Sequence, residues 1–513
     1  MSTPERRAGG RRSKAGRSGG GIPQLPWERV VNPYPPMRLL DDEQMDALHR
    51  TSLRILSELG LRVMSDKAVE LFAKAGAIVD RGERVVRIDE SIIREALKTA
   101  PTDFTLTPRN VGRAVHFGGA SLVFGLVAGP PNVHDRINGR RPGNLPDYEN
   151  FVRLAQHFNV IHMLGNQVVA PMELPANSRH LDTYRANLTL SDRAFHCSAI
   201  GRGRAVDAIK MMAIARGLPL DAVKASPGVT TIISVNSPRL FDDAMADGLM
   251  AMAEHGQPVT VTPFTLMGAM TPVTLPAALA QQNAEALFGV ALTQLVNPGA
   301  PVMYGAFTSN VDMRSGAPAF GTPENTKANV IGGQLARRYG LPYRTSNSNA
   351  SNAVDLQAAY ETAMATWGAV LGGANLIYHA AGWLEGGLTA SYEKVILDVE
   401  ILQNMVEFLR PIPFGEGDLG FEAIRDVPPG GHFFGSEHTS ARYETAFYRP
   451  MLSNWQNYGG WVEAGSHDAL ERATQLWQQA LRDYEEPVMD PARREELDAY
   501  VARRKEEIGR GEP

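Results

Sequence analysis

The sequence contains a single cysteine, Cys197, among 513 residues. One cysteine excludes an intrachain disulfide and any metal site built from several thiolates. A chain without disulfides suits a reducing compartment, so we expect a cytoplasmic protein. The sequence also lacks any run of about 18 apolar residues, so we expect no membrane span.

An excess of charge of one sign is also missing. The formal net charge is −5, which provides no overall field to attract nucleic acid or an anionic membrane. The exception is the basic stretch over residues 1–21, where arginine and lysine stand among glycine and serine. No apolar stretch follows it, so it is not a secretion signal. We predict a disordered basic tail over residues 1–30; the alternative is a docking arm for an acidic partner.

Several catalytic motifs are absent as well. There is no phosphate-binding Walker loop and no Gly-x-Ser-x-Gly nucleophile elbow. No cluster of histidine and cysteine has zinc-ligand spacing. His432 and His438 lie in a predicted loop, with no helix or strand to bring them together on a metal. We therefore expect no metal bound by this chain.

What the sequence does contain is a long alternation of apolar runs and helical patterns. The predicted strands are Leu122–Val127, Ile161–Val169, Ala194–Ile200, Val229–Val235, Pro258–Pro263, Pro301–Ala306, Pro342–Asn347 and Ala374–Ala380. The predicted helices are Pro146–Phe158, Ser178–Ser191, Arg204–Arg216, Pro238–His255, Pro276–Val296, Thr322–Tyr339, Val354–Leu371 and Tyr392–Leu409. Eight strands, each followed by a helix, predict an α/β fold of the (β/α)₈ barrel type over residues 121–411. A doubly wound open sheet is the structural alternative.

Both flanks of this barrel are predicted to be extensions. Residues 31–120 should form helices and hairpins, and residues 412–513 a Gly/Pro-rich connection followed by helices packed on the barrel. The N-terminal elements we expect are a helix from Asp41 that ends at Gly60, helices Asp66–Ala75 and Asp89–Ala100, a strand Arg84–Ile88, and hairpins over 104–133.

The residues just past the barrel strands should face the active site. The segment Tyr343–Glu385 is the most informative, because an amide-rich loop follows one strand and histidine, tryptophan and glutamate follow the next. The strand ends together give a candidate substrate-binding set: Phe264, Tyr304, Phe307, Trp383, His196, Asn236, Asn347, Asn349 and His379.

This candidate set is rich in aromatic and neutral polar side chains and poor in fixed charge. It suits a small organic cation held on aromatic faces, each contact contributing roughly 0.5–2 kcal/mol when desolvated. Each of these candidate residues could also have a purely structural role. The aromatic residues could plug the barrel mouth, the histidines could be core residues, and the asparagines could cap a helix or shape a turn.

The sequence resembles the trimethylamine methyltransferase family, the corrinoid-protein-dependent methylamine and betaine methyltransferases. The likeness extends from about Leu40 to Asp490. It is carried by SLRILSELGLRVMSDKAVELFAKAGAIVD, RVVRIDESIIREAL, HDRINGRRPGNLPDYENFVRLAQHF, VDLQAAYETAMATWGAVLGGANLIYHAAGWLEGGLTASYEKVILDVEI and GGHFFGSEHTSARYETAFYRP. The resemblance implies a TIM barrel that moves a methyl group from an N-methylated amine to the Co(I) of a separate corrinoid protein. The chain lacks an Asp-x-His-x-x-Gly cobalamin sequence, so the corrinoid is expected on that partner.

One departure from the family bears on the substrate. Trimethylamine-specific members carry pyrrolysine in the barrel, whereas the corresponding loop here, TSNSNA at Thr345–Ala350, has only standard residues. The resemblance therefore implies a quaternary amine such as glycine betaine, proline betaine or carnitine. A quaternary amine already carries its charge and can lose a methyl group to a strong nucleophile, so we expect no catalytic acid, base or metal. The protein's task is to position the N–CH₃ bond.

In this interpretation the four aromatic candidates hold the ammonium group and the histidines and asparagines orient the polar tail. The corrinoid protein docks over the C-terminal ends of the strands. Two alternatives remain: methyl transfer directly to tetrahydrofolate, and a non-catalytic protein that binds quaternary amines. The sequence also allows a homo-oligomer.

Overall fold

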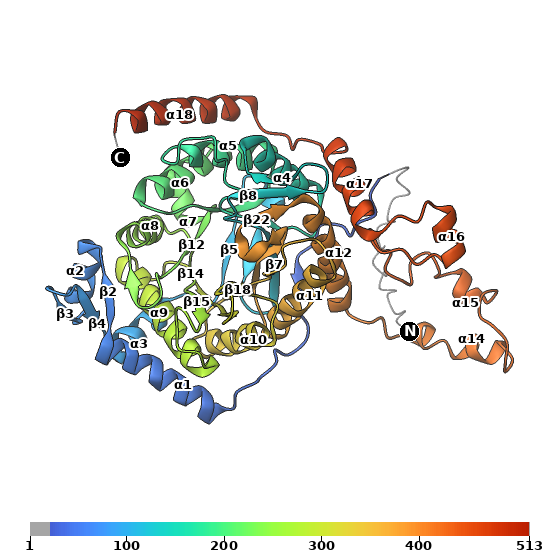
Figure 1. Ribbon diagram of the computed structural model, residues 1–513, viewed down its shortest axis with the longest axis horizontal. Helices are drawn as coiled ribbons and strands as arrows, with labels where there is room; N and C mark the ends of the chain where they lie inside the picture. Colours follow the sequence, from blue (N-terminus) through green and yellow to red (C-terminus); the bar gives the residue numbers. More distant parts are fainter. Residues whose placement is uncertain (1–20, 512–513) are drawn as a thin grey trace, which may run out of the picture.

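Eight parallel strands close into a barrel at the centre of the computed structural model, which describes residues 21–511 (Figure 1). The last strand pairs with the first, so the barrel is closed and the open-sheet alternative is wrong. The predicted (β/α)₈ fold is confirmed. In order the strands are β7 (Ser121–Leu126), β10 (Met163–Leu164), β11 (Ala194–Cys197), β12 (Thr230–Ile233), β14 (Val259–Val261), β16 (Val302–Gly305), β19 (Tyr343–Ser346) and β20 (Leu376–Ala381).

A ring of helices surrounds these strands (Figure 1). Its members are α4 (Leu145–His157), α5 (Arg179–Leu190), α6 (Arg202–Arg216), α8 (Asp243–Glu254), α9 (Leu275–Val296), α10 (Pro323–Arg338), α11 (Leu356–Leu371) and α12 (Tyr392–Leu409), with the short α7 (Leu220–Ala225) between α6 and α8. Side-chain caps fix several starts: Asn144, Asp242 and Thr322 each accept a hydrogen bond from the first turn of their helix. Because the helices cover the outer side and side chains fill the inner side, the strands are buried on both faces.

A hairpin closes the N-terminal end of the barrel. It is formed by β5 (Phe104–Leu106) and β6 (Val115–Phe117), which pair in antiparallel fashion. Its side chains join residues at the strand starts, such as Val123 and Leu376, in one buried cluster. This end is therefore filled, which leaves the C-terminal end for a site.

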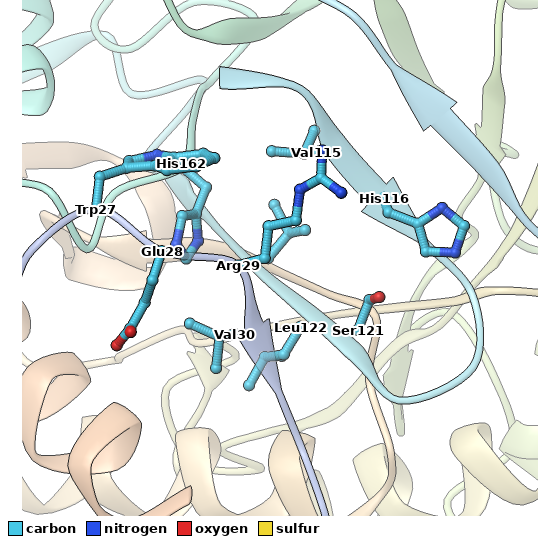
Figure 2. A pocket seen from close by; sticks show the side chains of 10 residues that line it. Trp27, Glu28, Arg29, Val30, Val115, His116, Ser121, Leu122 and His162 are labelled. Atoms are coloured by element: carbon cyan, nitrogen blue, oxygen red, sulfur yellow. The ribbon is translucent and has the colours of Figure 1, made fainter. Parts of the chain in front are cut away.

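Residues 21–30 pack against the barrel, so that part of the predicted disordered tail is wrong; residues 1–20 lie outside the described residues. Gln24 Nε2 donates to the His157 carbonyl, and β1 (Val30–Val31) pairs with β7. A hollow of about 20 Å³ lies beside this segment, lined by residues such as Trp27 and His162 (Figure 2). It has room for about one water molecule, which is too little for a substrate.

The N-terminal extension forms a small layer on the outside of α9. It contains α1 (Asp42–Arg54), a π-helical turn (Ile55–Leu59), α2 (Asp66–Lys74), α3 (Glu90–Thr99), β2 (Leu61–Val63), β3 (Ile78–Asp80) and β4 (Val85–Arg87); β13 (Leu240–Phe241) of the barrel joins their sheet. Gly60 ends the first helical segment with φ 69°, and Asp89 caps α3, as the sequence predicts. Phe72 anchors the layer, with its ring centroid 4.3 Å from that of Phe288.

The C-terminal region has two parts. Helices α17 (Ala469–Arg482) and α18 (Pro491–Gly509) pack on the barrel: the Trp477 ring lies 4.8 Å from that of Tyr392, and Tyr500 donates a 2.7 Å hydrogen bond to Asp207. The four short helices before them, α13 (Glu416–Leu419), α14 (Phe421–Asp426), α15 (Glu437–Ser440) and α16 (Tyr458–Glu463), bury no side chain. Within residues 21–511 no helix has the length and apolarity needed to cross a membrane.

Candidate active site

Short strands continue past the barrel at its C-terminal end and form a rim. β15 (Phe264–Met267) follows β14, β17 (Phe307–Val311) follows β16, and the two pair in parallel with Phe264 opposite Phe307. β18 (Pro318–Ala319) pairs with β17. A second rim sheet contains β21 (Trp383–Leu384), β22 (Thr389–Ser391), β8 (Asn132–Asp135) and β9 (Gly139–Pro142). From the sequence, Phe264, Phe307 and Trp383 were expected just past the barrel strands; in the structure, pairing of further short strands fixes their positions.

These rim strands bring four aromatic rings and one imidazole together, which we call the aromatic cluster. The Phe307 ring lies 4.9 Å from Phe264, 5.4 Å from Phe320 and 6.2 Å from Trp383, measured between ring centroids. His379 joins from β20, 4.2 Å from Trp383 and 6.0 Å from Phe307. Four of the nine predicted site residues therefore meet in one place, above the ends of the barrel strands.

His379 reaches the aromatic cluster through an unusual backbone conformation. Its φ is +57°, and the pairing of β20 with β7 is irregular between Ile377 and Ala381. A left-handed residue that is not glycine is uncommon and concentrates at functional sites. Burial, with help from Arg344 and His196, holds the pKa of His379 well below its usual value, so the ring is neutral. Nδ1 accepts a hydrogen bond from the Ala128 amide, which puts the proton of the neutral ring on Nε2.

Arg344 lies beneath the aromatic cluster, inside the barrel. Its Cζ is 5.2 Å from the ring centroids of both Phe307 and Tyr378, so the guanidinium lies near both rings. The residue is 1% exposed, and Nε and Nη1 have no hydrogen-bond partner in the protein. The groups among residues 21–511 that act on its charge are the hydroxyls of Tyr378 and Tyr343, and no carboxylate is among them. Burial lowers the pKa of Arg344 to about 10, so it remains a cation at neutral pH.

Arg193, another buried arginine, has the hydrogen-bond partners that Arg344 lacks. Arg193 is also fully buried, but it donates to the carbonyl groups of Ile161 and Gln156. The cost of burying its charge is offset by these hydrogen bonds. Arg344 has no comparable partner, so an anion is the ligand that its surroundings suit best.

His196 lies close to the same point of the barrel. Its ring centroid is 4.4 Å from that of Tyr378, and neither ring nitrogen has a hydrogen-bond partner among the described residues. Burial, followed by the charge of Arg344, lowers the pKa of His196 to about 3. A neutral imidazole can offer one donor and one acceptor to a polar ligand.

The amide-rich loop after β19 is buried and only partly satisfied. Asn347 Nδ2 donates to the Ala380 carbonyl, and Asn349 Nδ2 donates to Thr362 Oγ1. The Oδ1 atoms of both asparagines, with the hydroxyls of Ser346 and Ser348, have no partner in the protein. Buried polar atoms are rarely left this way, and here four occur in consecutive residues beside Arg344.

A buried network behind the loop fixes its position. Asp398 accepts hydrogen bonds from Thr362 Oγ1 (3.1 Å) and from the Gly382 amide (2.8 Å), and it forms an ion pair with Lys394. Thr362 in turn accepts the hydrogen bond of Asn349. The network therefore connects the loops that follow β19 and β20, which carry Asn349 and Trp383.

Two predicted site residues lie elsewhere. Tyr304 points outward from β16, and its hydroxyl donates to Asn283 of α9 at 2.9 Å. Its ring lies 5.9 Å from Tyr339, in the layer between strands and helices. Asn236 is exposed, and its backbone pairs with Leu240 in the loop after β12. Neither contacts the aromatic cluster.

Arg344 and Phe320 belong to the site but were not predicted from the sequence. An arginine inside the predicted buried strand Pro342–Asn347 was the available signal for Arg344, because a charge in such a run needs an explanation. Phe320 follows the two-residue strand β18, which has no recognisable sequence signature. No three histidine, cysteine, aspartate or glutamate side chains converge on a metal site anywhere in the described part of the chain.

The structure is thus an α/β barrel with aromatic rings and one buried cation gathered at the C-terminal ends of its strands. A family model described as trimethylamine methyltransferase (MTTB) matches residues 6–509. The chain belongs to this family, and it is a methyltransferase.

Two named relatives fit this assignment. A glycine betaine methyltransferase of Desulfitobacterium hafniense (strain Y51) is 36% identical over 476 residues, which covers 93% of this chain and 98% of the relative. A proline betaine:corrinoid methyltransferase of Eubacterium limosum is 27% identical over 478 residues, covering 90% and 97%. Among solved structures, the monomethylamine methyltransferase MtmB of Methanosarcina barkeri aligns with a TM-score of 0.48 at 11% identity, covering 87% of this chain and 95% of MtmB.

Proposed function

We propose that this enzyme removes a methyl group from a quaternary amine that carries a carboxylate, a betaine, and transfers it to a corrinoid held by a separate protein. The observation that carries the proposal is the unpaired guanidinium of Arg344 directly beneath the aromatic cluster. The two features match the two ends of a betaine, which has an anion and a quaternary ammonium a few bonds apart.

Arg344 is the proposed partner of the carboxylate. A buried cation without a partner costs several kcal/mol in an apolar interior. A carboxylate that binds it recovers part of that cost by accepting charge-assisted hydrogen bonds from the guanidinium. The neutral His196 and the unpaired Asn347 Oδ1 and Ser346 Oγ lie in the same region, where they would contact the substrate's polar tail or waters around it.

Phe264, Phe307, Phe320, Trp383 and His379 are the proposed partners of the ammonium group. A quaternary ammonium has no hydrogen to donate, so aromatic faces and dispersion provide its attraction. The neutral state of His379 matters here, because an imidazolium beside the ammonium would repel it.

The order of these groups along the barrel axis determines which end of the substrate is presented. Arg344 lies within β19, whereas Phe264, Phe307 and Trp383 lie on rim strands beyond the barrel. A betaine held in this way has its carboxylate inside the barrel and its N-methyl groups toward the open end. A reduced corrinoid is a strong nucleophile that accepts a methyl cation equivalent. The chain's own contribution is to hold the N–CH₃ bond in line with the entrance and to exclude water.

The relatives support this proposal. One is named for glycine betaine and another for proline betaine and a corrinoid. We extend these activities to this chain as a proposal, with a corrinoid protein as its partner at the C-terminal end of the barrel. We also propose that the reaction takes place in the cytoplasm, where the buried thiol of Cys197 stays reduced.

The test is incubation of the enzyme with a reduced corrinoid protein and a series of amines. Glycine betaine has both a quaternary nitrogen and a carboxylate, choline has a quaternary nitrogen but no carboxylate, and trimethylamine has neither. We expect dimethylglycine to form in step with a change in the corrinoid spectrum. Demethylation of trimethylamine alone, or no methyl loss from any betaine, would contradict the proposal.

A further inference from the structure

Residues 411–450, which we call the arm, leave the barrel without forming a core. None of these residues is buried, although the arm contains α13, α14 and α15. Its large apolar side chains point into solvent; Phe434 is 87% exposed and Phe421 is 70% exposed. In Figure 1, which looks into the ring of helices, the arm projects sideways beyond α12 and α17.

The arm is nevertheless anchored at both ends. Arg410 pairs with Glu28 and Glu407 just before it. Just after it, the amides of Met451 and Leu452 donate to the carboxylate of Glu400. The arm is thus a long excursion with fixed ends. A segment without a single buried residue gains little to offset the conformational entropy lost when it is ordered, so we infer that the arm packs on another surface.

A second exposed apolar feature lies on the same side of the ring of helices. The outer face of α11 carries Leu356, Tyr360, Met364 and Trp367, spaced so that they form one stripe along the helix. Leu356 is 83% exposed and Tyr360 is 54% exposed. Outer helices of a barrel normally present polar residues to solvent, so this stripe is an exception.

The stripe continues onto the neighbouring segments. The Phe408 ring at the end of α12 lies 5.0 Å from Trp367, and the Tyr34 ring lies 5.5 Å from Phe408. The result is an apolar surface beside the point where the arm begins. We call these six residues on α11, α12 and the N-terminal segment the α11 stripe.

We propose that the enzyme is a homodimer in which the arm of each protomer packs on the α11 stripe of the other. Two complementary apolar surfaces on one chain allow a closed twofold interface, in which each arm packs on the partner's stripe and neither surface is left open. The arm alone carries five strongly exposed aromatic side chains, Phe414, Phe421, Phe434, Tyr443 and Phe447. Aromatic side chains bury on the order of 150–250 Å² each. Five therefore approach the roughly 800 Å² that one partner contributes to a standard interface.

A second copy explains the arm better than the corrinoid protein does. An arm without a core needs a partner that is always present, and every chain has its own copies available. A methyl carrier has to dissociate in each cycle, which suits a smaller and more polar contact. In Figure 1 the arm also lies to the side of the ring of helices and not over the barrel, where the carrier has to reach the substrate. This last argument rests on the proposed function, but the dimer itself does not.

The experiment is a mass measurement on the full chain by light scattering and sedimentation. We expect a dimer, with twice the 55.8 kDa of one chain. Phe421→Asp with Phe434→Asp in the arm should give monomers, and so should Leu356→Asp with Tyr360→Asp in the stripe. Ile78→Asp, at an equally exposed apolar site on β3 away from both surfaces, is the matched control and should stay dimeric. Circular dichroism and melting of the barrel show whether each variant is folded.

Cysteine cross-linking tests the contact itself. The only native cysteine is buried, so Phe434→Cys and Tyr360→Cys proteins can be mixed and joined by a short bifunctional maleimide. A heterodimeric product supports the arm-on-stripe contact. A monomeric wild-type chain, or a dimer unaffected by both pairs of substitutions, would overturn the proposal. A monomer that binds its corrinoid protein only with an intact arm would assign the arm to that partner and would also overturn it.

Discussion

The guanidinium carbon of Arg344, on barrel strand β19, lies 5.2 Å from the ring centroid of Phe307, on rim strand β17. This contact joins the one unpaired cation inside the described barrel to the aromatic cluster above it. It therefore links the two halves of the proposed betaine site. The burial of Arg344, of the aromatic cluster and of the network behind them has measurable effects on stability and activity.

Replacing Arg344 with methionine should leave the free enzyme as stable or make it more stable. The substitution removes a buried charge that has no carboxylate partner, and such replacements are often neutral or stabilising by about 1–4 kcal/mol. Thermal melting without substrate measures this. Glycine betaine should raise the melting temperature of the wild type but not of the variant. A large loss of stability in Arg344→Met would show that the arginine has a structural role.

The aromatic cluster should contribute to binding through its rings. Trp383→Leu should raise the KM for glycine betaine by roughly 2–30-fold, the equivalent of losing about 0.5–2 kcal/mol of cation–π attraction. Tyr304→Phe is the matched control, since its hydroxyl donates to Asn283 outside the site. That variant should lose roughly 1 kcal/mol of stability and leave KM within about twofold. An equal effect of both substitutions on KM would contradict the assignment.

The buried ion pair Lys394–Asp398 should support the site from behind. Asp398→Asn leaves a buried lysine unpaired and weakens the hydrogen bonds from Gly382 and Thr362. We expect it to lower the free energy of unfolding by about 3–5 kcal/mol and to reduce activity. Denaturant unfolding of Lys394→Met, Asp398→Leu and the double variant completes a thermodynamic cycle. The double variant should be more stable than the sum of the single losses, yet still impaired in activity. Additive losses would argue against coupling.

His196 gives a prediction about pH. Burial depresses its pKa in the folded state to about 3, whereas an unfolded histidine titrates near pH 6.5. The unfolded chain therefore takes up a proton that the folded chain does not. The contribution of His196 to the free energy of unfolding is therefore fully present above about pH 6.5. It is lost as the pH falls toward 3, at roughly 1.4 kcal/mol per pH unit. His196→Asn should flatten this slope between pH 6 and about 4.5. Tyr304→Phe should leave the slope unchanged, because burial holds the pKa of the Tyr304 hydroxyl well above its usual value; identical slopes in both variants would refute the assignment.

The barrel could be predicted from the sequence because its signal is repeated and local. Each apolar run such as Ala194–Ile200 is short, uninterrupted and followed by a helical pattern, so eight repeats reinforce one another. The rim strands could not be predicted in the same way. β15 and β17 have only a few residues each, and they are strands because they pair with each other, which depends on how the barrel closes.

The site was predictable only in part, for a related reason. Residues past the strand ends were the right place to look, and Phe307, His379 and Trp383 do meet there. Whether a strand residue faces inward depends on the phase of a two-residue alternation. Met303 points into the barrel, whereas its neighbour Tyr304 points outward toward α9. An error of one residue in the predicted alternation therefore turns an outward-facing residue into a predicted site residue. Arg344 was overlooked because a buried strand is not expected to carry an unpaired charge.

The ratio of kcat/KM for glycine betaine to that for choline, in wild type and in Arg344→Met, tests the proposed betaine specificity. The two amines share a trimethylammonium group and differ in having a carboxylate or a hydroxyl. We expect wild type to prefer glycine betaine strongly. The variant should lose roughly 10²–10³-fold of that preference, the effect of removing one partner of a buried charge pair. A wild type that demethylates choline as well as glycine betaine, or a preference unchanged by Arg344→Met, would contradict it.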